Sequence, residues 1–317
     1  MVFERLKGKK KTQFYFFSGK GGVGKTSMSA ATALYFAKKG KKVLIISTDP
    51  AHSLSDSFEE KIGGEIKKLR KNLFAVEIDP KKAMQEYKEK IMGHIEKVDY
   101  LKDLGLEETF GVADMSPGID EVAAFDKFLQ YMHSGDYDVI IFDTAPTGHA
   151  LRFLSLPDVL DSWVGKIISI RMKLAGLASM IKKFLPFTKD DEQPSIGTEQ
   201  LEAMKKRIED AKKILTDKNK THFWIVTIPE QMSIYESERA RKMLESYGID
   251  ITGVIVNQLI PENKCEFCQA RREMQQENLK LIHEKFSDVK IKEIPLFKHE
   301  VKGYDKLEII GKMLFEK

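Results

Sequence analysis

Residues 19–26 carry the glycine-rich pattern G-x-x-x-x-G-K-[ST], set between an apolar run and a long helical pattern. Residues 14–18 read FYFFS, the composition of a buried strand, and residues 27–40 have the character of a helix that ends at a glycine. A strand, a glycine turn and a helix in this order form the context in which such a loop binds phosphate. The pattern therefore commits the amino-terminal part of the chain to an α/β unit with a phosphate-binding loop.

The residue types in this loop suit a nucleoside triphosphate with magnesium. Glycines let backbone N–H groups approach a phosphate closely, and the amino end of the following helix favours anions. The pattern predicts that Lys25 contacts the β and γ phosphates and that the Thr26 hydroxyl holds Mg²⁺. The residues predicted to bind the nucleotide here are Gly19, Lys20, Gly21, Gly22, Val23, Gly24, Lys25, Thr26 and Ser27. A glycine turn without nucleotide would not need the flanking strand and helix.

Further apolar runs predict the other strands of one sheet. They lie at residues 43–47, 73–78, 139–142, 223–227 and 254–256. Their apolar residues are continuous rather than alternating, which is typical of parallel strands buried on both faces. Helical patterns lie between them, so the sequence predicts an α/β fold with a doubly wound, mostly parallel sheet.

Two long stretches interrupt this alternation. Residues 81–133 and 158–199 show helical spacing of apolar residues without a strand pattern. We expect them to form an all-helical subdomain inserted into the sheet domain. The P-loop domain would then be discontinuous, formed by residues 1–80, 134–157 and 200–317.

Two aspartates follow predicted strands and complete the predicted site. Asp143 ends the apolar run at 139–142, the pattern of an acid that binds the Mg²⁺ shell, and we expect this contact to pass through water. Asp49 follows the run at 43–47, where a carboxylate beside the loop can orient or deprotonate the attacking water. Capping of the next helical turn by Asp49 would be compatible with that role.

The only two cysteines form the motif Cys265-Glu266-Phe267-Cys268. Structural zinc usually takes four ligands in a tetrahedron, and one chain supplies two thiols. Two chains related by a twofold axis would supply four, so we expect Cys265 and Cys268 to hold a zinc ion shared between two subunits. An unmetallated pair and a redox switch are the alternatives.

Residues 163–187 are dense in Ile, Leu, Met and Phe, with lysines between them. A groove for an apolar helix would explain this surface, and methionine suits contacts with varied sequences. The ordinary core of a helical insertion and a helix lying on a membrane surface are the alternatives. The candidate groove residues are Met132, Ile168, Met172, Leu177 and Met180.

Three motifs together carry a family resemblance. They are the loop with its second lysine, Lys20, residues 47–56 (STDPAHSLSD) and residues 143–152 (DTAPTGHALR). In these motifs the chain resembles the family of arsenical-pump and tail-anchored-protein-targeting ATPases, and its loop is similar to that of MinD and nitrogenase iron protein. The resemblance extends to Asn257 and to residues 295–303, although Ser53 stands where many relatives have asparagine.

The resemblance implies an ATPase that works as a homodimer. It implies that Lys20 reaches across the interface to the partner's phosphates, so that Lys20 joins Asp49 and Lys25 as a catalytic residue. It also implies that Asn257 and Pro295 lie on the adenine side. The cofactors expected are ATP, Mg²⁺ and Zn²⁺.

The cysteine motif distinguishes two branches of that family. Pump subunits are usually two fused halves with separated cysteines, whereas targeting members carry C-x-x-C at their dimer interface. The resemblance therefore implies a factor that binds the transmembrane helix of tail-anchored proteins and delivers it to a membrane receptor through ATP-driven opening and closing. An arsenite-transport-associated ATPase is one alternative. A MinD-like regulator anchored to a membrane by residues 307–315 is another, although that segment alternates acids and bases.

Charge and hydropathy exclude several other classes. With 52 Lys and Arg against 48 Asp and Glu the net charge is +4, so nothing indicates a nucleic-acid partner. Residues 1–11 are basic and lack the apolar core of a signal peptide. The chain shows no run of about 18 apolar residues that could span a membrane. We expect a cytosolic protein.

Overall fold

The computed structural model describes residues 12–48, 52–79, 82–83, 85–86, 127, 129–143, 206 and 209–316. The predicted catalytic Asp49 and the groove candidates Ile168, Met172, Leu177 and Met180 lie outside the described residues. The sheet, the phosphate loop and the cysteine motif lie inside them. The structure therefore describes the nucleotide side of the predicted site, and the expected helical subdomain stays a prediction.

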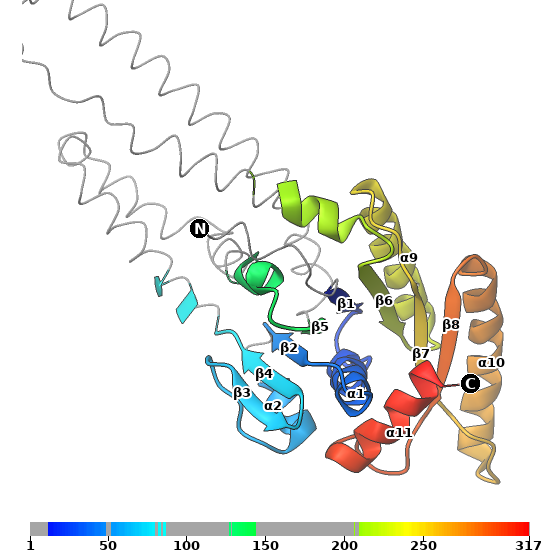
Figure 1. The fold of residues 1–317 in the computed structure, drawn as a ribbon. Helices are drawn as coiled ribbons and strands as arrows, with labels where there is room; N and C mark the ends of the chain where they lie inside the picture. Colours follow the sequence, from blue (N-terminus) through cyan, green and yellow to red (C-terminus); the bar gives the residue numbers. More distant parts are fainter. Residues whose placement is uncertain are drawn as a thin grey trace, which may run out of the picture.

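Eight strands form one sheet in the order β3-β4-β2-β5-β1-β6-β7-β8 (Figure 1). They are β1 (Gln13–Ser18), β2 (Val43–Ser47), β3 (Lys67–Arg70), β4 (Leu73–Glu77), β5 (Val139–Asp143), β6 (Thr221–Thr227), β7 (Gly253–Leu259) and β8 (Lys290–Pro295). All neighbouring strands are parallel except β3 and β4. Residues of β2 and β5 are buried throughout, as the continuous apolar runs require. The predicted doubly wound, mostly parallel sheet is confirmed.

Helices cover both faces of this sheet (Figure 1). They are α1 (Lys25–Lys38), α2 (Ser53–Phe58), α9 (Gln231–Ser246), α10 (Glu266–Lys285) and α11 (Tyr304–Phe315). Alternate residues of β1 point to opposite sides: Phe14 and Phe16 pack in a core with α9 and α10, whereas Tyr15 and Phe17 pack in a core with α1, α2 and α11. The period of two along each strand thus divides the apolar interior into two layers.

The predicted groove residue Met132 belongs to this interior. Helical residues 129–134 place Leu129 and Met132 in the same core as Phe16 of β1 and Phe142 of β5, and each of these two side chains is only 4% exposed. A side chain enclosed in this way cannot line an open groove. This placement corrects the expectation for Met132, whose helical spacing indicated an apolar face but not what covers it.

The carboxyl-terminal helix is likewise part of the core. Leu307, Ile310 and Leu314 of α11 are buried against the face of the sheet that also carries α1. The apolar side of residues 307–315 is therefore occupied, which argues against the membrane-anchor alternative. Within the described ranges, no helix combines the length and the apolar character needed to cross a membrane.

The two edges of the sheet carry charged side chains. At one edge, β3 exposes Lys67, Lys68 and Arg70 and buries Leu69. At the other edge, β8 has the sequence KIKEIP, in which Lys290 is exposed and Ile294 is buried. Strands β3 and β8 lack the continuous apolar run of the inner strands, because the outer edge of each faces solvent.

Candidate active site

The phosphate loop lies at the middle of the sheet, between the carboxyl end of β1 and the amino end of α1 (Figure 1). Parallel pairing aligns Phe17 of β1 and Ser47 of β2 with Asp143 at the end of β5. Because the carboxyl ends of parallel strands meet at one edge, the loop and Asp143 share that edge. Asp143 is 2% exposed, and its carbonyl oxygen accepts a hydrogen bond of 3.3 Å from the Thr48 backbone N–H.

The backbone of the loop needs its glycines. Gly22 and Gly24 have φ values of 73° and 96°, a left-handed conformation that side chains with a Cβ disfavour. A Cβ added to Gly24 would lie 2.3 Å from Nδ2 of Asn257. Gly24 therefore serves both the turn into α1 and the close approach of β7 to the loop.

The start of α1 suits an anion. Gly24 supplies no side-chain cap, and the first turn of α1, all of which the structure describes, contains no acidic residue. The first N–H groups of a helix have no carbonyl partner within it and attract negative charge. Lys25 opens the helix, followed by Thr26 and Ser27. This donor set fits a polyphosphate.

Residues at the end of β7 hold the loop from its other side. Asn257 Nδ2 donates a hydrogen bond of 2.9 Å to the carbonyl oxygen of Val23. Gln258 Nε2 donates one of 3.2 Å to the carbonyl oxygen of Gly22. Asn257, predicted on the adenine side, thus directs its amide hydrogen to the loop backbone itself. Pro295 ends β8 and pairs in register with Leu259 of β7, which brings the two predicted adenine-side elements to neighbouring strands.

The residues expected to hold magnesium also fit that ion. Thr26 offers a hydroxyl in the first turn of α1, and α1 packs against β5, which ends in the buried carboxylate of Asp143. Hydroxyl and carboxylate oxygens are ligands that Mg²⁺ prefers. The predicted pair of magnesium residues is therefore compatible with the structure.

Lys20 forms an ion pair within its own chain. Its ammonium group contacts the Glu236 carboxylate of α9, with 59% of the Lys20 side chain and 16% of the Glu236 side chain exposed. The predicted contact of Lys20 with the nucleotide of a second subunit would require this pair to separate. Glu236 was not identified from the sequence.

A buried carboxylate secures the segment that follows the predicted catalytic Asp49. Glu77, at the end of β4, is 3% exposed and accepts hydrogen bonds from the backbone N–H and the Oγ of Ser55, both at 2.9 Å. His52 Nδ1 lies 3.0 Å from the same carboxylate, and His52 has a left-handed φ of 56°. The sequence signal was available, because Glu77 is an acid that ends an apolar strand at the same edge as Asp143.

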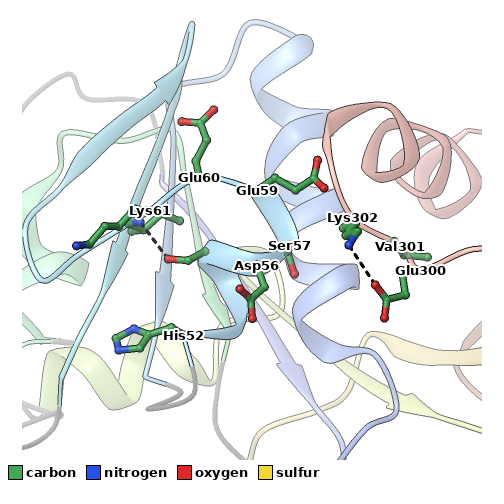
Figure 2. A pocket seen from close by; sticks show the side chains of 11 residues that line it. His52, Asp56, Ser57, Glu59, Glu60, Lys61, Glu300, Val301 and Lys302 are labelled. Atoms are coloured by element: carbon green, nitrogen blue, oxygen red, sulfur yellow. Dashed lines mark hydrogen bonds and ion pairs between the residues drawn. The ribbon is translucent and has the colours of Figure 1, made fainter.

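A hollow lies between α2 and residues 300–302 (Figure 2). Four acids line it: Asp56, Glu59, Glu60 and Glu300. In Figure 2 Glu300 pairs with Lys302, at 3.3 Å between Oε2 and Nζ. The backbone N–H of Gly303 donates a hydrogen bond of 3.0 Å to the carbonyl of Ser57, so the segment after β8 is joined directly to α2. Ser53 begins α2, and its carbonyl accepts a hydrogen bond from the Ser57 hydroxyl.

The cysteine motif lies at the amino end of α10. Cys265 is the residue before the helix and is exposed, and Cys268 lies in its first turn, with both thiols free. Hydrogen bonds from Cys268 lower the pKa of the Cys265 thiol, and the same pair raises the pKa of Cys268. Among the described residues no group of three or more His, Cys, Asp or Glu side chains could hold a metal. Two free thiols, one exposed and one half-buried, are half of a tetrahedral zinc set, which fits sharing with a second chain.

Comparison with known protein families identifies one match across nearly the whole chain. The family model described as anion-transporting ATPase matches residues 12–316. This range includes the phosphate loop, both predicted aspartates and the cysteine motif. The match agrees with the ATPase chemistry that the loop geometry supports.

Individual relatives are similar over nearly all of this chain and over 81–94% of their own length. A protein named ATPase GET3 from Podospora anserina is 39% identical over 314 residues, covering 95% of this chain and 90% of that protein. ATPase ASNA1 homolog 2 from Paramecium tetraurelia is 38% identical over 308 residues, covering 96% and 94%. ATPase GET3B from Arabidopsis thaliana is 36% identical over 337 residues, covering 99% and 81%.

Proposed function

Since this chain belongs to the anion-transporting ATPase family, we propose that its ATP hydrolysis drives the targeting of tail-anchored membrane proteins. In this proposal a cytosolic homodimer binds the transmembrane helix of the client and delivers it to a membrane receptor. The observation that carries the choice within the family is the C-x-x-C pair Cys265 and Cys268, whose thiols are free, with Cys265 exposed and Cys268 half-buried. A C-x-x-C motif is the mark of the targeting members in the family resemblance.

The hydrolytic step is assigned to residues around the loop. Loop N–H groups and Lys25 bind the phosphates and offset the charge that develops on the leaving group. Asp49 orients the attacking water and accepts its proton. Thr26 and Asp143 would hold Mg²⁺, which when bound draws charge from the β and γ phosphate oxygens.

The second subunit completes the site in this proposal. Lys20 leaves Glu236 and contacts the partner's phosphates when the dimer closes. Cys265 and Cys268 share one zinc ion with the same residues of the partner. Asn257 and Pro295 lie beside the adenine in this proposal, and their positions in the carboxyl-terminal halves of the neighbouring strands β7 and β8 support that assignment.

The client groove is assigned to the helical subdomain, residues 81–133 and 158–199. A transmembrane helix has about 20 apolar residues, so its carrier must cover it on several sides. Ile168, Met172, Leu177 and Met180 are the proposed groove residues, without the buried Met132. The described surfaces support this choice indirectly, because the apolar side of α11 is already packed in the core.

The test combines client capture with hydrolysis. The double variant Ile168→Asp, Met172→Asp should lose recovery of a soluble complex with a co-expressed tail-anchored protein and retain ATPase activity. The matched control is Ile309→Asp, Met313→Asp, which alters two exposed side chains of α11 at the same spacing and should retain the client. Asp49→Asn should bind ATP but not turn it over. Client capture by the groove variant would refute the groove, and stimulation of hydrolysis by arsenite would favour the transport alternative.

A further inference from the structure

Helix α10 carries two buried amide side chains in the middle of its length. Gln275 and Asn278 are 5% and 7% exposed. Buried amides are costly unless they are hydrogen-bonded. Asn278 Nδ2 donates a hydrogen bond of 2.9 Å to the carbonyl of Pro229, just beyond β6, and Gln275 is bonded to the end of β7. Helix α10, which follows Cys265, is thus joined to the carboxyl ends of β6 and β7, two of the strands on one side of the phosphate loop.

Gln275 uses both of its polar atoms on one turn of the chain. Its Oε1 accepts a hydrogen bond of 2.8 Å from the Ile260 backbone N–H, and its Nε2 donates one of 3.1 Å to the carbonyl of Gln258. The pairing of β7 with β8 is irregular in the same place, between Val256 and Leu259. The side-chain amide therefore replaces backbone pairing where the sheet is interrupted.

The turn that Gln275 holds is strained. Gln258 has a φ of 62°, although it is not a glycine. This left-handed conformation is unfavourable for a residue with a Cβ and persists only where the surroundings enforce it. Gln275 accepts a hydrogen bond from the Ile260 N–H and donates one to the Gln258 carbonyl, on either side of Leu259. These two bonds supply that enforcement.

This conformation aims the Gln258 side chain at the phosphate loop. Gln258 Nε2 and Asn257 Nδ2 bind the carbonyl oxygens of Gly22 and Val23. In a planar trans peptide the C=O and the N–H point in opposite directions. Fixing these two carbonyls toward β7 therefore turns the N–H groups of Val23 and Gly24 away from β7. Phosphate loops bind phosphate through backbone N–H groups presented in this manner.

We propose that Gln275 is a positioning residue for nucleotide binding, which acts on the phosphate loop through the left-handed Gln258. The inference rests on nucleotide binding at the loop and is independent of client, zinc and dimer. The hydrogen bonds run from Gln275 of α10 to the turn at the end of β7, and from Gln258 to Gly22 of the phosphate loop.

The first experiment compares Gln275→Leu with Gln276→Leu, the same change at the exposed neighbouring position of α10. The dissociation constant for ADP with Mg²⁺ is measured by calorimetry, together with KM and kcat for ATP and the thermal transition without nucleotide. Gln275→Leu should raise the dissociation constant for ADP about tenfold, equivalent to ~1.4 kcal/mol. For ATP hydrolysis, KM should rise while kcat stays unchanged. Gln276→Leu should match the wild type. A purely structural role would lower the thermal transition of Gln275→Leu and leave the dissociation constant within twofold, which would overturn the proposal.

A second set of variants decides the matter even where Gln275→Leu fails to fold. Asparagine tolerates the left-handed backbone at position 258, but its shorter side chain places the amide farther from the Gly22 carbonyl. Gln258→Asn should therefore weaken ADP binding to a similar extent. Gln258→Gly needs no enforcement, so adding Gln275→Leu to it should cause a smaller further loss than in the wild type. Wild-type affinity in Gln258→Asn, or full additivity of the double variant, would overturn the proposal. Failure of the wild type to bind ADP would overturn the loop assignment and this inference together.

Discussion

Replacing Gly24 by alanine should destabilise the protein through two effects that the structure separates. The first is backbone strain, because Gly24 has a φ of 96° and a left-handed residue with a Cβ costs about 1–2 kcal/mol. The second is a clash, since the new Cβ would lie 2.3 Å from Asn257 Nδ2. Moving Asn257 aside breaks its hydrogen bond to Val23, a loss of about 1 kcal/mol. We expect the free energy of unfolding to fall by roughly 2–3 kcal/mol in total.

The matched control is alanine at Gly21 in the same loop. A Cβ there meets no heavy atom within 4 Å, and Gly21 is not among the glycines with positive φ. Gly21→Ala should therefore change the free energy of unfolding by no more than about 0.5 kcal/mol. Urea unfolding without nucleotide measures both variants. Equal stability of Gly21→Ala and Gly24→Ala would refute this reasoning. Gly24→Ala and Asn257→Ala both remove the same hydrogen bond, from Asn257 to Val23, so full additivity of their effects on the free energy of unfolding would also refute it.

Three further predictions concern other sites. Burial and the Lys290 charge lower the pKa of His222 in the folded protein. The contribution of the neutral imidazole to the free energy of unfolding is therefore complete above the unfolded-state pKa of about 6.5 and is lost as the pH falls below that value. His222→Phe should reduce the loss of stability that urea unfolding shows between pH 7 and 5. Cys265→Ser should abolish a zinc content of about one ion per two chains, measured by atomic emission, and weaken the dimer in sedimentation. Glu236→Gln should barely alter stability and should raise the ATPase rate if Lys20 acts across the dimer.

The inner part of the fold was predictable from local chemistry. Continuous apolar runs predicted the buried strands, and the glycine pattern predicted the loop between β1 and α1. The edge strands β3 and β8 were missed because Lys67, Lys68 and Lys290 interrupt the apolar pattern by which buried strands are detected. An edge strand is defined by its neighbour in the sheet, which the local sequence does not contain.

The same limit applies to the site. Lys25, Thr26 and Asp143 could be proposed because their roles follow from a short motif. Gln258 and Gln275 could not, since their roles arise from contacts between distant parts of the chain: Gln258 and Gly22 are 236 positions apart. Helical spacing correctly placed Met132 on the apolar face of a helix, yet only the fold shows that this face packs against the sheet.

The charged edges of the sheet have a consequence for a protein proposed to bind aggregation-prone transmembrane helices. A chain extending the sheet at β3 would have to pass beside the exposed Lys67 and Lys68, and one extending it at β8 beside Lys290. Strand addition at such an edge is unfavourable because the ammonium groups would lose water. An unfolded client therefore gains little by pairing its backbone with this domain. The client can therefore attach only through its apolar side chains. Its release then requires no breaking of backbone hydrogen bonds between strands of the client and of this domain.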